Sequence, residues 1–281
     1  MRERIITKDM IESFIRYLKS EEKSKNTIEK YERDVTAFYV YIDGAYVNKE
    51  SVIAYKNKLI CEEYSPRSIN SMLSSINSFL CFVGWEDCKV KAIRIQHQMY
   101  CAEDKELTKS EYTKLVRTAQ KLNNIRLYLI LQTICATGIR VSELQYITVE
   151  AVKNGRAIVS LKGKIRQIFI VRELQKKLMK YICKNHIKSG PVFITCKSKP
   201  ISRITVWREM KRLCEYAGVN SQKVFPHNLR HLFARIFYKM ENDIAKLADI
   251  LGHSSINTTR IYIISSGNEH RRYMENMKLI I

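Results

Sequence analysis

The amino-acid sequence predicts a mainly α-helical protein with a small β-sheet, built from a four-helix front domain and an α+β second domain. Apolar residues from Lys8 to about Gly84 recur with a period of about 3.6, as they do in amphipathic helices. Two adjacent runs rich in β-branched residues, on either side of Lys162, indicate one β-hairpin. The charge divides in the same way: residues 1–99 hold 16 Lys and Arg against 14 Asp and Glu, whereas residues 100–281 hold 33 against 14.

The front domain, residues 1–85, is predicted to contain four helices. Asn26 or Thr27 is the expected N-cap of the second helix. Ser65 followed by Pro66 is typical of an N-cap and a first helical turn, so the fourth helix is expected to begin there. The four helical stretches lie at about 10–18, 26–42, 49–61 and 65–84.

Residues 86–106 combine mixed charge with no clear periodicity, which suits a linker between domains. Thr108 and Glu111 have the spacing of a capping box and mark the start of the second domain, residues 107–281. A buried helix is predicted at Ile125–Thr137, ended by a glycine. Further helices are expected at about 173–184, 203–217, 227–240, 243–251 and 255–263.

The hairpin of the second domain is predicted from Ala157–Leu161 and Ile165–Val171. These runs meet at Lys162-Gly163-Lys164, which places Lys162 at the apparent tip. Val192–Ile194 is expected to form one more short strand.

The formal net charge of +21 indicates a polyanionic partner, because each neutralised phosphate releases counterions. A membrane surface is not expected, since no basic amphipathic helix with a large apolar face is found. Eight cysteines without CxxC spacing favour free thiols over disulfides or a zinc site. The first residues lack the apolar core of a signal peptide, so a cytoplasmic protein is expected.

Six residues of the second domain follow one another in an order that suits phosphodiester chemistry: Arg140, Lys162, His227, Arg230, His253 and Tyr262. A phosphodiester resists cleavage because its pentacoordinate transition state gathers negative charge and its leaving alkoxide is poor. A metal-free enzyme must therefore supply cations around the nonbridging oxygens, a proton donor and a nucleophile. The fork of an arginine suits the first task, and Lys162 suits the second, with Lys164 as a competing candidate.

His227, Arg230 and His231 lie at i, i+3 and i+4, so they are predicted to share one helix face. One of the two histidines is expected to accept the proton of the nucleophile or to bond a nonbridging oxygen. His253 follows a glycine at a helix end, where its side chain can point into a cleft. Tyr262 is the candidate nucleophile, chosen by position among 16 tyrosines. Each residue alone also fits an ordinary surface or core role, and the order of the set decides against that interpretation.

The boxes around these residues resemble the tyrosine recombinase (phage integrase) family in its compact Xer-like or transposon-type form. The front domain likewise resembles the core-binding, SAM-like domain of that family. The resemblance implies that all six residues are catalytic and that Tyr262 is the nucleophile. One departure is the turn after Lys162-Gly163, which is shorter than in the family. The boxes run in motif order between about Leu107 and Met277, at Thr137–Leu144, His227–His231 and Leu251–His253.

The resemblance implies a site-specific recombinase that cleaves and rejoins double-stranded DNA through a 3′-phosphotyrosine, without ATP, metal or other cofactor. It also implies a tetramer on two duplexes, in which a C-terminal helix at about Glu269–Ile281 docks on a neighbouring subunit. Xer-like resolution, integration or excision of a mobile element, and inversion stay open. The alternatives are a type IB topoisomerase and a non-catalytic DNA-binding regulator, which has no need of six such residues in order.

Overall fold

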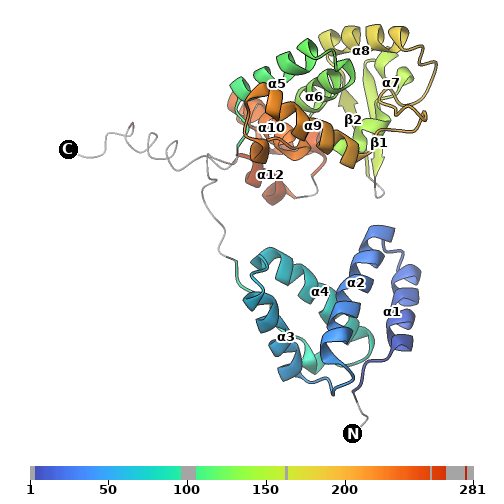
Figure 1. Cartoon of the computed structure of the whole chain (residues 1–281), viewed down its shortest axis with the longest axis vertical. Helices are drawn as coiled ribbons and strands as arrows, with labels where there is room; N and C mark the ends of the chain where they lie inside the picture. Colours follow the sequence, from blue (N-terminus) through green and yellow to red (C-terminus); the bar gives the residue numbers. More distant parts are fainter. Residues whose placement is uncertain (1–3, 96–105, 162–163, 254, 264–275, 277–281) are drawn as a thin grey trace. The chain divides into compact units, whose positions relative to one another are not determined.

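The computed structural model describes residues 4–95, 106–161, 164–253, 255–263 and 276, and the chain divides into two units (Figure 1). The first unit is Met1–His97 and the second is Gln98–Ile281. The described part is mainly helical and contains one two-stranded sheet, which confirms the predicted fold class. No helix within these described ranges is long and apolar enough to cross a membrane.

The first unit contains four α-helices at the places that the apolar period predicts. The fourth begins as expected, with Ser65 as N-cap and Pro66 in the first turn. The expected cap of the second helix, Asn26 or Thr27, is wrong. Ser24 caps it instead, because its backbone is extended and its hydroxyl accepts a hydrogen bond from the Thr27 amide. The helices are α1 Lys8–Ser20, α2 Lys25–Ile42, α3 Lys49–Cys61 and α4 Pro66–Phe82.

Aromatic side chains dominate the core of the first unit, where Phe14, Phe38 and Phe79 are fully buried. Residues 86–95, which the sequence assigned to the linker, extend this unit. A short 3-10 helix, η1 (Glu86–Cys88), follows α4, and Cys88 is buried in the same core. Apolar burial thus continues past the last α-helix of this unit.

In the second unit, α6 (Ile125–Thr137) is the central element, since it packs against α5, α8, α9 and α10. Ile130, Leu131 and Ile134 on this helix are fully buried, as predicted. The Thr108–Glu111 capping box at the start of α5 is also confirmed. The other helices are α5 Lys109–Lys121, η3 Val141–Tyr146, α7 Val149–Lys153, α8 Arg172–Lys184, α9 Arg203–Ala217, η4 Ser221–Lys223, α10 Pro226–Glu241, α11 Ile244–Leu251 and α12 Ile256–Ile263.

The predicted hairpin is present as β1 (Arg156–Leu161) and β2 (Lys164–Phe169), which pair antiparallel with Leu161 opposite Lys164. The third strand expected at Val192–Ile194 is wrong. Around that stretch, Pro191 forms an isolated bridge with Thr148, and Ile194 forms another with Pro200. A proline has no N–H to donate, so neither bridge extends into a ladder.

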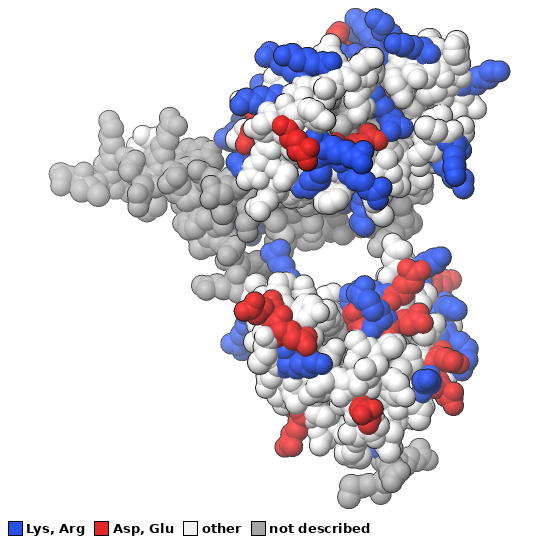
Figure 2. Space-filling model, viewed as in Figure 1, with Lys and Arg blue, Asp and Glu red and all other residues white. Residues whose placement is uncertain are grey.

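The surface charge follows the division that the sequence shows. In Figure 2, Lys and Arg predominate over the second unit, whereas both signs are interspersed on the first. The surface of the second unit therefore favours contact with a polyanion.

Candidate active site

The loop that carries Arg140 begins where α6 ends, at Gly138. Gly138 has a left-handed φ of 65°, and a Cβ there would lie 2.5 Å from Phe233 Cδ1 on α10. Only glycine therefore allows the helix to end this close to α10. The chain then places Arg140 at the start of η3, with 42% of its side chain exposed.

Glu143 holds Arg140 in place. Its side chain is 1% exposed and accepts hydrogen bonds from the Arg140 amide at 2.7 Å and from Arg140 Nη1 at 3.1 Å. Its Oε2 also accepts from Nη2 of Arg166 on β2. A buried carboxylate with two arginine partners fixes the loop and leaves part of the Arg140 guanidinium free for an anion.

Arg230 lies in α10 and is 1% exposed, which is exceptional for a charged residue. Its Nη1 donates to the Gly138 carbonyl at 2.6 Å, and its Nη2 donates to the Leu251 carbonyl at 2.7 Å. Burial, followed by the charge of Arg140, lowers the Arg230 pKa to about 10, so the guanidinium is still charged at neutral pH. Arg230 therefore connects the end of α6 to the end of α11.

His253 follows α11 and accepts a hydrogen bond on Nε2 from Arg230 Nη2 at 2.9 Å. Because arginine can only donate, the neutral tautomer carries its proton on Nδ1, which donates to Thr259 Oγ1 at 2.8 Å. Burial, followed by the charges of Arg230 and Arg140, lowers the His253 pKa to about 4. His253 is therefore neutral at physiological pH.

Tyr262 lies on α12 and is 6% exposed. Its ring stacks on His231, with centroids 4.0 Å apart and planes inclined by 21°. The Tyr262 ring centroid also lies 5.3 Å from that of His227, 5.1 Å from that of His253, and 6.0 Å from Arg230 Cζ. The predicted nucleophile is thus surrounded by the predicted histidines and one predicted arginine.

The two histidines of α10 are also shifted toward their neutral forms. Burial, followed by the charges of His227 and Arg230, lowers the pKa of His231 to about 3. The pKa of His227 is lowered as well, by the enclosure of its ring and by Arg230 and Arg140. A neutral imidazole beside the tyrosine can accept a proton.

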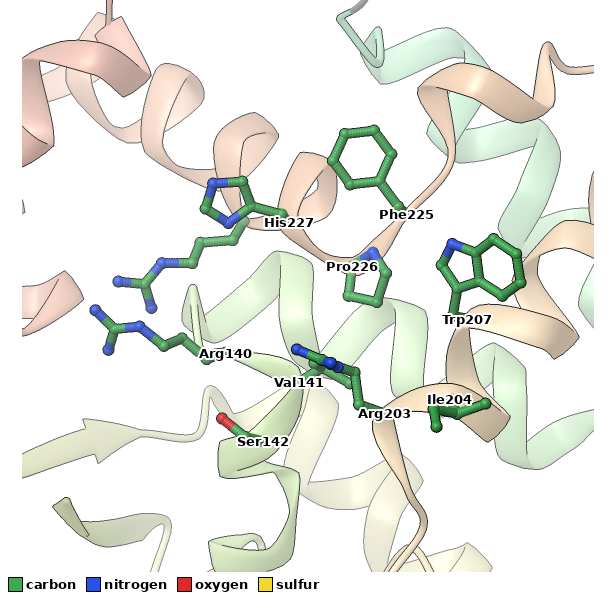
Figure 3. Close-up of a pocket in the computed structure, with 10 residues that line it drawn as sticks. Arg140, Val141, Ser142, Arg203, Ile204, Trp207, Phe225, Pro226 and His227 are labelled. Atoms are coloured by element: carbon green, nitrogen blue, oxygen red, sulfur yellow. The ribbon is translucent and has the colours of Figure 1, made fainter. Parts of the chain in front are cut away.

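A hollow of about 720 Å³ adjoins this cluster, and Arg140, His227 and Arg230 line it. In Figure 3, Arg140 and His227 lie on one side, and Trp207 and Phe225 lie on the other. The cationic Arg140 opposite two aromatic rings suits a phosphate that carries a sugar and a base. The remaining lining residues are Val141, Ser142, Arg203, Ile204 and Pro226.

The structure brings together five of the six predicted residues, since Arg140 shares the hollow with His227 and Arg230. Lys162 and Gly163 lie outside the described residues, between the end of β1 and the start of β2. Sequence reasoning gave no role to Glu143 or Arg166. The i, i+3 spacing from Arg140 was a usable signal for Glu143, because it matches the capping box that η3 forms.

Comparison with known proteins decides the family. Residues 105–269 match the model of the phage integrase family, and residues 11–87 match its N-terminal SAM-like domain. The chain belongs to the phage integrase family.

Full-length relatives of this integrase are tyrosine recombinases. The XerA tyrosine recombinase of Pyrococcus furiosus is 30% identical over 100% of this chain and 98% of its own length. The XerA of Pyrococcus horikoshii is 31% identical over 99% of this chain and 97% of its own length. The predicted enzyme class, a tyrosine-type site-specific recombinase that breaks and rejoins DNA strands, is confirmed at the level of the family.

Solved structures share the fold of this integrase. A λ integrase dimer bound to a COC′ core site has a TM-score of 0.74 at 19% identity, over 92% of this chain and 95% of that one. The XerH recombinase bound to its difH substrate has a TM-score of 0.70 at 17% identity, over 95% and 84%. Both matches span both units of the chain.

Proposed function

We propose that this recombinase cleaves and rejoins double-stranded DNA at a specific site by transferring a phosphodiester onto the Tyr262 hydroxyl. The arrangement of Tyr262, with neutral histidines against its ring and Arg230 at 6.0 Å from the ring centroid, supports this proposal most directly. Arg140 at the hollow supplies a second cation for the nonbridging oxygens.

The reaction starts when the Tyr262 oxygen attacks phosphorus and its proton passes to His227. His227 is the better placed of the two α10 histidines, because it lines the hollow while His231 stacks face to face on the tyrosine ring. The attack forms an O–P bond to the tyrosine and breaks the bond to the 5′-oxygen. Lys162 donates the proton that this oxygen takes up, and His253 bonds a nonbridging oxygen. Attack of another 5′-hydroxyl on the phosphotyrosine rejoins the strand and releases the tyrosine. The energy of the broken phosphodiester is therefore conserved in the covalent intermediate.

DNA binding must open the cluster before this attack. Arg230 and Tyr262 expose only 1% and 6% of their surfaces, and one N–H of Arg230 points at His253. A phosphate that enters the hollow offers Arg230 a charged acceptor in place of the imidazole nitrogen. The loss of that bond frees His253 to take the tautomer with its proton on Nε2, with Thr259 then donating to Nδ1, and this Nε2–H can donate to a nonbridging oxygen.

The full-length likeness to XerA proteins favours the compact Xer type over larger integrases. A type IB topoisomerase is the second candidate for the same chemistry, and the SAM-like domain at residues 11–87 argues against it. We place the working complex as a tetramer on two duplexes, as in the λ integrase tetramer bound to a Holliday junction. The C-terminal segment expected to join subunits, Glu269–Ile281, lies outside the described residues apart from Asn276. We place the protein in the cytoplasm, since each cysteine in the described part is a free thiol.

The test is covalent capture. DNA trapped on the wild-type chain in cells is sequenced to recover the site, and a duplex nicked beside the scissile phosphate then traps the intermediate in vitro. Tyr262→Phe keeps the ring and loses the oxygen, so the adduct is expected to vanish while DNA binding stays near wild type. Tyr216→Phe, on an exposed residue of α9, is the matched control and is expected to form the adduct normally. An undiminished adduct in Tyr262→Phe would assign the nucleophile to another residue.

A further inference from the structure

Arg166 joins three parts of the second unit that are far apart in sequence. It lies on β2, and its side chain is 13% exposed. Nη1 donates to the Ile250 carbonyl at 2.7 Å, and Nη2 donates to Glu143 Oε2. One side chain thus bridges the hairpin, the Arg140 loop and the end of α11.

Gly252 shows how closely Arg166 packs against the segment before His253. A Cβ on Gly252 would lie 2.6 Å from Arg166 Cδ and 3.1 Å from its Nε. Gly252 also has a left-handed φ of 64°. The left-handed backbone therefore favours glycine, and the Arg166 side chain would have to shift to make room for a Cβ one residue before His253.

Glu143 connects Arg166 to Arg140. The carboxylate that accepts from Arg166 also accepts from the Arg140 amide and from Arg140 Nη1. Without Arg166, this almost fully buried carboxylate keeps Arg140 as its one ion-pair partner among the described residues. An arginine suits the position because its fork reaches a carboxylate and a carbonyl on different elements at once, which an ammonium group cannot do.

We propose that Arg166 is a positioning residue that sets Arg140, through Glu143, relative to the segment that carries His253. This inference rests on the proposed function, because it assigns Arg140 to the phosphate. Arg166 does not line the hollow and is not expected to touch DNA. An ion pair that served stability alone would explain the Glu143 contact. It would not predict that the effect of losing Arg166 on the cleavage rate depends on the charge of the scissile phosphate.

The experiment compares two substrates built on the recovered site, one with a normal scissile phosphate and one with a methylphosphonate there. The methyl group replaces a nonbridging oxygen and removes the charge that Arg140 stabilises. With the phosphate, Arg166→Ala is expected to slow strand cleavage by about ten- to a hundredfold, the range that a misplacement of about 1 Å produces. With the methylphosphonate, the same variant is expected to approach the wild-type rate, as is Arg140→Ala. Arg166→Lys is expected to show the same dependence on substrate with a smaller loss.

Arg156→Ala, on the exposed side of β1, is the matched control and should cleave both substrates normally. Melting temperatures establish whether each variant is folded. If Arg166→Ala does not fold, the comparison of the two substrates is made with Arg166→Lys. An equal loss on both substrates, or no loss on either, overturns the proposal. If the wild-type chain forms no Tyr262-dependent adduct with the phosphate substrate, the proposed function fails instead, and the two failures are distinguishable.

Discussion

Replacing Arg230 by methionine is expected to slow strand cleavage strongly and to leave the fold in place. The arginine is 1% exposed, so its surroundings are those of a core residue, which an unbranched apolar side chain can fill. Methionine removes the charge and every donor. If the guanidinium serves the transition state, cleavage should fall by about a hundred- to a thousandfold, as when a preorganised donor to a developing oxyanion is lost.

The expected change in stability follows from two opposing effects. The lowering of the Arg230 pKa from 12.5 to about 10 corresponds to roughly 3 kcal/mol against the charged side chain, and methionine relieves it. Against this, the carbonyls of Gly138 and Leu251 lose their donors, at about 1 to 3 kcal/mol each, whereas the third acceptor, the partly exposed His253 ring, can bond water instead. The net effect lies between about 1 kcal/mol of stabilisation and 3 kcal/mol of destabilisation, so the melting temperature should fall by no more than about 10 °C.

The assay combines covalent capture on the nicked duplex with a thermal melt of the same preparation. Arg117→Met, an exposed arginine of α5, is the matched control and should keep both activity and melting temperature. Cleavage by Arg230→Met within tenfold of wild type would refute the role of Arg230 at the phosphate. A variant that no longer melts cooperatively would refute the balance of energies given above.

Three further predictions concern pH, the hairpin and assembly. Because the fold lowers the pKa of His231 to about 3 and that of His253 to about 4, the unfolded chain binds more protons below its ordinary histidine pKa of about 6.5. The stability that these two histidines contribute is therefore present above about pH 6.5 and is lost as the pH falls toward 4. The melting temperature should fall with it, and His231→Gln should make that fall shallower. A sulfur at the bridging 5′-position, which is a better leaving group, should restore cleavage to Lys162→Ala; rescue of Lys164→Ala instead would move the acid to that residue. Truncation after Gly267 should leave single-site DNA binding intact and weaken synapsis, as gel shifts with one and two sites will show; full tetramer formation by the truncated chain would contradict it.

Much of the fold follows from local patterns. Gly138 ends α6 as expected, because glycine is favoured at a left-handed C-cap whatever packs beside it. Ser65 and Pro66 likewise mark the start of α4. Where local signals compete, the sequence prediction fails. Ser24, Asn26 and Thr27 are all plausible caps by residue type, and the extended backbone of a cap is found at Ser24.

The candidate site is likewise predictable from the sequence only in part. The spacing of His227 and His231 predicts their proximity, and their ring centroids lie 4.6 Å apart. The burial of Arg230 does not follow from that spacing, since it depends on the carbonyls of Gly138 and Leu251 that meet it from other elements. The Glu143–Arg166 contact has no local signal at all, because 23 residues separate the partners.

The resting arrangement also restrains Tyr262, the proposed nucleophile. Tyr262 is held by a stack on His231, and such aromatic pairs contribute about 0.5 to 1.5 kcal/mol beyond the area that they bury. Arg230 is held more firmly, by two carbonyls and His253. The two carbonyls belong to the backbone, whereas the imidazole is a partly exposed side chain, and a phosphate is an anion and thus a stronger acceptor than the neutral imidazole. A phosphate in the hollow therefore displaces His253 first, and Tyr262 then has to leave its packing beside Ala234, Leu247 and Leu251 as well as the stack on His231. Under the proposed function, cleavage therefore depends on occupation of the hollow by DNA as well as on the tyrosine.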